Sequence, residues 1–170
     1  MTVDLENRVA QMPFGQEAEA LVRKAVARTL QLQGETDRVQ VSILLLDDEG
    51  VRALNREYRG IDRATDVLSF PLLEYDGLEA DDEGLDPEEL QESTDPETGE
   101  IMLGDIAISL ERAKVQAEDF GHSLSREVAY LTVHAMLHLL GYDHVNLEDR
   151  ALMRQREEVI LTDLGLTREA

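Results

Sequence analysis

The sequence predicts a mixed β-sheet of about four strands with about five helices packed against it. Apolar segments with strand character and segments with helical periodicity alternate in the order β-α-β-α-β-β-α-α-α, and this order places the helices against one sheet. The segment 123–140 is apolar nearly all round, which is typical of a central, buried helix. A chain of 170 residues with 42% hydrophobic residues is expected to form a single domain.

The first half of the chain is predicted to hold two strands and two helices. Apolar residues recur every three or four positions in the first helix, and Gly34 follows it. The second strand is apolar enough to lie inside a sheet, and Asp47 or Asp48 can cap the helix after it. The predicted elements are strand 2–9, helix 14–33, strand 39–46 and a helix from the cap to about residue 58.

The second half is predicted as strands 66–70 and 101–108, followed by helices 110–120, 123–140 and 147–164. Gly104 interrupts the second of these strands. Gly121 ends the helix after it, and Ser123 or Ser125 caps the next helix. The last helix is amphipathic, and its inner side is expected to carry Leu152, Val159 and Ile160.

Acidic residues dominate the charge of the chain, with 37 Asp and Glu against 16 Lys and Arg, a net charge of −21. Taken alone, this argues against a nucleic-acid-binding protein, because phosphates attract Lys and Arg. The segment 74–100 holds thirteen of the acids and no base, so the rest of the chain carries −8. This acidic segment is expected to be a solvated or disordered insert, or else a docking segment for a basic partner.

Several protein classes are disfavoured by composition. The chain has no cysteine, which excludes disulfides and thiolate metal sites. Its first ten residues do not resemble a signal peptide, and no apolar run approaches the roughly 18 residues of a membrane helix. We therefore expect a cytosolic protein that makes no membrane contact.

Three of the four histidines lie within eleven residues, at the spacing H-x-x-x-H-x-x-G-x-x-H. A helix places His134 and His138 on one face, one turn apart. Gly141 can take a left-handed conformation that ends the helix, so that the chain can turn back and bring His144 to the same point. Three imidazoles and one open position are the usual ligands of a catalytic zinc, so the spacing predicts a Zn²⁺ site and a hydrolase.

The spacing also matches the metzincin peptidase pattern H-E-x-x-H-x-x-G-x-x-H, except that Ala135 occupies the position of the essential Glu. This counts against a peptidase, although Asp143 or Glu127 could substitute as a base. Phosphodiester cleavage instead needs a cation at the phosphoryl oxygens, and Arg matches phosphate geometry. Arg59 is the candidate, although composition alone favours a surface role for it.

Three motifs of the sequence together resemble those of one known protein family. The segment 134–144, HAMLHLLGYDH, resembles the motif H-G-x-L-H-L-x-G-Y-D-H of the YbeY-type endoribonucleases, which are rRNA maturation factors. Segments 54–59 and 65–71 resemble the family's L-N-x-x-Y-R and T-D-V-L-S-F-P, and 103–106 is its L-G-D-I. The resemblance extends over roughly 39–164.

The resemblance implies an α+β fold with the metal-binding helix under a mixed sheet. It also implies a single-strand-specific, metal-dependent endoribonuclease that acts in 16S rRNA 3′-end maturation and ribosome quality control. Zinc would be bound by His134, His138 and His144, and Arg59 would be the catalytic residue in the cleft. The implied partners are RNA and the ribosome or a ribosomal protein.

Two departures and two rival functions accompany this interpretation. Ala135 replaces the usual Gly, and the acidic insert is longer than expected. One rival is a hydrolase of a peptide or amide bond, which would need a carboxylate near the metal-bound water. The other is a non-catalytic ribosome-assembly factor with a structural metal, which predicts a closed fourth coordination position.

Overall fold

A computed structural model describes residues 1–73, 91–142 and 146–166 of the chain. Within these ranges a mixed four-stranded sheet has the order β1-β2-β4-β3. β1 (Thr2–Asn7) is parallel to β2 (Val39–Leu46), which is parallel to β4 (Ile101–Ser109), and β3 (Val67–Pro71) runs antiparallel to β4. β3 is therefore an edge strand.

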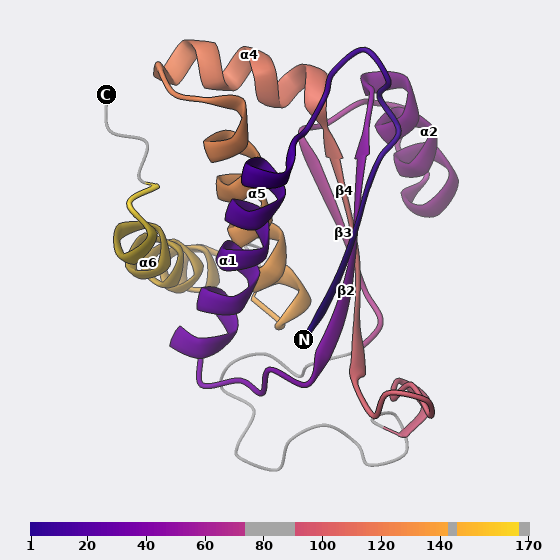
Figure 1. The fold of residues 1–170 in the computed structure, drawn as a ribbon, viewed down its shortest axis with the longest axis vertical. Helices are drawn as coiled ribbons and strands as arrows, with labels where there is room; N and C mark the ends of the chain where they lie inside the picture. The colour runs from indigo at the N-terminus through magenta and orange to yellow at the C-terminus, as the bar shows by residue number, and fades with distance from the viewer. Residues whose placement is uncertain (74–90, 143–145, 167–170) are drawn as a thin grey trace.

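Five helices in the described ranges cover the two faces of the sheet unequally. In Figure 1, α1 (Gln16–Leu32), α4 (Leu110–Phe120) and α5 (Leu124–Leu139) lie on one side and α2 (Asp48–Arg59) lies on the other. α6 (Leu147–Leu164) packs on α5, on the side away from the sheet. No helix in these ranges is long and apolar enough to span a membrane. The predicted α+β fold, with about four strands and five helices, is confirmed.

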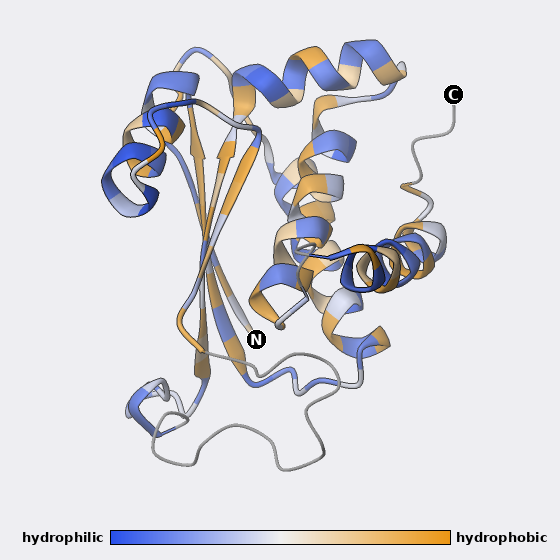
Figure 2. Ribbon diagram, turned by 180° about the vertical axis from the view of Figure 1, so that it is seen from behind, coloured by the Kyte–Doolittle hydropathy of each residue, from blue (hydrophilic) through white to orange (hydrophobic). Residues whose placement is uncertain are grey.

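α5 is the central helix, in contact with α1, α4, α6, β3 and β4. Ser123 caps it by accepting a hydrogen bond from the Arg126 amide. Figure 2 shows that hydrophobic residues predominate on the strands and on α5. The C-terminal half of α5 is buried except at three half-buried residues, which recur every four residues at positions 130, 134 and 138. This spacing gives α5 one face that opens away from the core.

Gly104 marks the closest approach of the sheet to α5. Its φ is 149°, and a Cβ built there would lie 2.3 Å from the carbonyl oxygen of Phe70 and 2.9 Å from Cδ2 of Leu139. The register between β2 and β4 shifts beside it, between Gln40 and Val41. The interruption predicted at Gly104 is thus a bulge that lets β3 and β4 pack closely against α5.

Two details differ from the sequence-based expectations. Val159, predicted on the inner side of the last helix, is 50% exposed, whereas Met153, Ile160 and Leu161 are buried. The reason is geometric. Only a narrow stripe of buried residues on α6 faces α5, and Val159 lies just beside that stripe. The first strand also ends earlier than predicted, at Asn7.

Part of the acidic segment 74–100 is described by the structure. Residues 74–90 lie outside the described residues, so their predicted disorder stays a prediction. Residues 91–100 pack against the sheet, where Gln40 donates to Asp95 Oδ2 at 3.0 Å and Thr2 donates to Glu100 Oε1 at 2.6 Å. The Met1 ammonium also lies 2.9 Å from Glu100. Some of the acids therefore have a structural role at the start of β1 and β2.

Replacement of Gly104 by Ala should destabilise the fold strongly, because the added methyl would collide with backbone and with α5. We expect Gly104→Ala to lower the free energy of unfolding by about 3 to 5 kcal/mol, combining strain and overpacking. Gly121→Ala is the matched control, since Gly121 also has a positive φ of 69° but has no atom within 4 Å of the built Cβ. Urea unfolding of Gly121→Ala should show a loss of only about 1 kcal/mol in the free energy of unfolding. Equal losses in Gly104→Ala and Gly121→Ala would contradict the packing argument.

Candidate metal centre and cleft

His134 and His138 lie side by side on the open face of α5, as their four-residue spacing predicts. Their ring centroids are 4.9 Å apart, with an angle of 77° between the ring planes. Both side chains line one cavity of about 1050 Å³. Two imidazoles one turn apart, on a helix held at the centre of the fold, form a rigid pair of nitrogen donors.

Each histidine has its Nδ1 held by a partner outside α5. His134 Nδ1 lies 2.9 Å from Oε2 of Glu157, which belongs to α6. His138 Nδ1 lies 2.9 Å from the carbonyl oxygen of Tyr142, in the turn after α5. A carbonyl only accepts, so His138 donates from Nδ1, and Nε2 is the nitrogen that either ring presents to a metal.

The turn after α5 is anchored at both ends. Gly141 has a φ of 98°, as its predicted role at the helix end requires, and Tyr142 donates its amide to the carbonyl of Leu137. The Tyr142 hydroxyl donates to Gln33 of α1 at 2.6 Å. Burial raises the pKa of this hydroxyl, so it remains a neutral donor at physiological pH. These bonds fix the carbonyl that orients His138.

His144, the predicted third ligand, lies outside the described residues, and its role stays a prediction. Across residues 1–73, 91–142 and 146–166, no group of three or more His, Cys, Asp or Glu could hold a metal ion. The two imidazoles that are described still fit zinc, because both Nδ1 atoms are engaged and both rings open on the same cavity. The donor chemistry suits zinc, and also other imidazole-binding divalent ions.

Arg59 reaches the same cavity from the end of α2, on the far side from α5. Its Nη2 donates to the carbonyl of Ser69 at 2.6 Å, and its guanidinium carbon lies 5.5 Å from the centre of the Phe70 ring. The Tyr58 ring contacts Phe70 edge to face at 5.6 Å between centroids. β3 thus holds the guanidinium in place beside the cavity, and the bond to Ser69 uses one of its five N–H donors.

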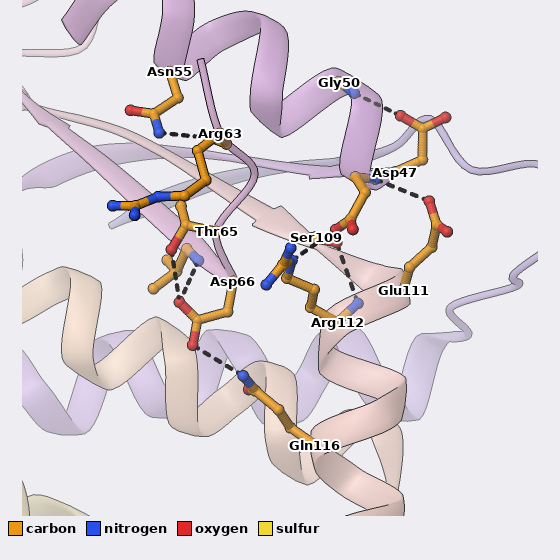
Figure 3. Close-up of polar contacts among 12 residues, drawn as sticks. Asp47, Gly50, Asn55, Arg63, Thr65, Asp66, Ser109, Glu111, Arg112 and Gln116 are labelled. Carbon is orange, nitrogen blue, oxygen red and sulfur yellow. Dashed lines mark hydrogen bonds and ion pairs between the residues drawn. The ribbon is translucent and has the colours of Figure 1, made fainter. Parts of the chain in front are cut away.

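Two further arginines, Arg63 and Arg112, also line this cavity. Asn55 donates to the Arg63 carbonyl at 2.8 Å, which fixes the segment between α2 and β3 (Figure 3). Arg112 lies 3.1 Å from Asp48. Arg59 and Arg63 form no ion pair within the described residues, so these two arginines bring positive charge to the cavity inside a strongly acidic chain.

Asp66 is the acidic residue among the described residues that line this cavity. Its Oδ1 accepts from the Val67 amide at 2.8 Å and its Oδ2 accepts from Gln116 at 3.2 Å (Figure 3). Both oxygens therefore hold the start of β3 against α4. Glu127, considered as a substitute base, is fully buried, lies 2.9 Å from His122 and does not line the cavity.

The sequence did not identify Glu157, Arg63 or Arg112 as site residues. Glu157 lies 23 positions after His134, on a different helix, and no spacing rule relates the two. Arg63 and Arg112 come from separate segments that meet only when β3 pairs with β4. Their role follows from the fold, and the sequence alone offers no signal for it.

Comparisons with known proteins identify a family. The family model described as "Endoribonuclease YbeY" matches residues 4–165. A protein of Caldanaerobacter subterraneus subsp. tengcongensis named "Endoribonuclease YbeY" is 50% identical, covering 99% of this chain and 100% of the relative. One of Caldicellulosiruptor saccharolyticus with the same name is 41% identical, covering 99% and 100%.

The fold also resembles a solved structure, the solution structure of a Thermotoga maritima protein. The TM-score is 0.52 at 20% sequence identity, and the match covers 96% of this chain and 92% of the other. This likeness supports the arrangement of strands and helices described above.

Removal of the carboxylate that holds His134 should weaken metal binding. We expect Glu157→Gln to lower zinc affinity by about 10- to 100-fold, because the partner of a metal-binding His orients the ring and raises its basicity. The measurement is competition with a chromophoric chelator. Glu158→Gln is the control, since this neighbour is exposed and should leave affinity unchanged. Equal affinity of both variants and the wild type would contradict the role of Glu157.

Proposed function

The chain belongs to the YbeY endoribonuclease family, and we propose that it is a zinc-dependent endoribonuclease of single-stranded RNA. Its role is in 3′-end maturation of 16S rRNA and in ribosome quality control. The protein works in the cytoplasm as one domain, with the ribosome or a ribosomal protein as its partner.

The observation that carries this proposal is the charge of the cavity. In a chain of net charge −21, the cavity that contains His134 and His138 is also lined by Arg59, Arg63 and Arg112. Arginine in a concave site is a usual means of binding a phosphodiester. A peptide substrate would need no such cluster, and its hydrolysis would need a proton-shuttling carboxylate.

Each described residue has a defined task in this reaction. His134 and His138 would hold the metal through Nε2, and Glu157 and the Tyr142 carbonyl fix the two rings through Nδ1. When bound, zinc supplies Lewis-acid polarisation and an activated water or 2′-hydroxyl. Arg59 donates to the phosphoryl oxygens, where charge develops in the transition state. Its bond to Ser69 pre-orients the guanidinium, so little reorganisation is needed when substrate binds.

Substrate selection is proposed to come from shape and from a partner. A concave cavity of about 1050 Å³ suits the unstacked nucleotides of a single strand better than a duplex. Because the whole chain has only 16 basic residues, RNA binding by the protein alone should be weak and sensitive to salt. The ribosome would then supply the affinity and the choice of site.

Loss of the Arg59 side chain should abolish most of the activity without loss of metal. We expect Arg59→Ala to reduce kcat on single-stranded RNA by about 100- to 1000-fold, as removal of one transition-state donor typically does. Zinc content should remain at the wild-type level. His138→Ala should lose both zinc and cleavage, which separates the two roles.

Arg56→Ala is the matched control for this experiment. Arg56 lies one turn before Arg59 on α2, is exposed, forms its ion pair with Asp62, and does not line the cavity. Its replacement should leave cleavage within about twofold of wild type. A wild-type protein that binds zinc stoichiometrically and supports ribosome maturation, yet never cuts RNA, would favour the assembly-factor function instead.

A further inference from the structure

A second, smaller cavity adjoins the first on the other side of His134. Its volume is about 340 Å³, and it lies between α5 and α6 beside the start of β3. Asp66, Val67 and His134 line both cavities. His134 therefore stands at their junction, so a strand that passes the metal site can continue from one cavity into the other.

Arg150 and Arg154 bring positive charge to this second cavity. Both are on α6, four residues apart, so they share one face of the helix and are separated by about 6 Å along its axis. Both side chains are exposed, and within the described part of the chain neither guanidinium forms a hydrogen bond or an ion pair. Other arginines on the surface, such as Arg28 and Arg52, are bound to Asp163 and Asp62.

The acidic residues of the second cavity are Asp66, Glu157 and Glu158, and two of them are committed elsewhere. Glu157 holds His134, and Asp66 accepts from Gln116 and the Val67 amide. Glu158 is exposed on α6. The two arginines thus remain the groups in this cavity with donors available for an anion.

We infer that Arg150 and Arg154 bind phosphates of the RNA strand on one side of the cleavage site. The strand runs from Arg59 and Arg63 past His134 and onto α6, so that the reacting phosphate lies at the junction of the cavities. This inference rests on the proposed endoribonuclease function and adds a binding subsite to it. Four of the 16 basic residues of the chain, Arg59 and Arg63 in the first cavity and Arg150 and Arg154 in the second, then follow one path.

The subsite binds flanking phosphates and takes no part in bond cleavage. Arg150→Gln/Arg154→Gln should therefore raise KM for single-stranded RNA by about tenfold and leave kcat within about twofold. The slope of log(kcat/KM) against log salt should fall by about 1.4, because each phosphate contact on a single strand contributes about 0.7. The same loss should appear in fluorescence anisotropy of labelled RNA bound to the full chain.

The control variant also removes two positive charges, but at positions outside both cavities. Lys24→Gln/Lys114→Gln lies on α1 and α4, where both side chains are exposed and line neither cavity. Its KM and salt slope should stay close to those of the wild type. Arg150→Lys/Arg154→Lys keeps the charge and should recover most of the affinity. Thermal unfolding of each variant reports whether the fold is unchanged.

RNA length gives a second, independent readout. RNAs shortened to one nucleotide from the cut, on either side, are compared with the full-length substrate. The effect of Arg150→Gln/Arg154→Gln should vanish for the RNA shortened on one side and persist for the other, since the second cavity lies on one side of His134.

The outcomes separate the two claims. The subsite is overturned if Arg150→Gln/Arg154→Gln has the same KM and salt slope as Lys24→Gln/Lys114→Gln, or if it loses kcat at unchanged KM. In either case, cleavage of RNA by the wild type still supports the endoribonuclease function. A wild type that neither binds nor cuts RNA overturns the proposed function and the subsite with it. A rise in KM that is specific to α6 and to one side of the RNA supports the subsite.

Discussion

The site depends on the hydrogen bonds that hold Nδ1 of His134 and His138. Both rings project from α5, whose other faces are buried against the sheet, α1, α4 and α6. Because both rings are only half-buried and line a cavity, the hydrogen bond at Nδ1 sets how each ring is oriented and leaves Nε2 as the available nitrogen. Glu157 and the Tyr142 carbonyl provide those partners. One set of contacts thereby joins α6 and the turn after α5 to the face of α5 that carries the two histidines.

The second constraint is electrostatic. An acidic chain must keep its negative charge away from a phosphate-binding surface. Two of the described acids that line the cavities, Asp66 and Glu157, are engaged in hydrogen bonds, and two acids of the segment 91–100, Asp95 and Glu100, accept hydrogen bonds from β2 and β1. The arginines beside the cavities therefore offer positive charge locally despite a net charge of −21, which is what the proposed binding of RNA requires.

Much of this fold could be predicted from local patterns. Periodicity and caps located β2, α4 and α6 with their observed bounds, and the spacing of His134 and His138 placed both rings on one face. The role proposed for Arg59 rests on a resemblance, because nothing in its own segment distinguishes a site residue from a surface one. Long-range partners such as Glu157 and Arg150 could not be predicted, since they meet the site only after α6 has packed on α5.

The central claim is that Nε2 of His134 and His138 share one metal ion on the open face of α5. X-ray absorption at the zinc edge and anomalous diffraction from zinc-loaded crystals test it most directly. The account predicts one ion bound by Nε2 of both rings, with His144 as the third protein ligand and a solvent oxygen in the fourth position. Rings that bind through Nδ1, rings that point apart, or a fourth protein atom on the ion would contradict it.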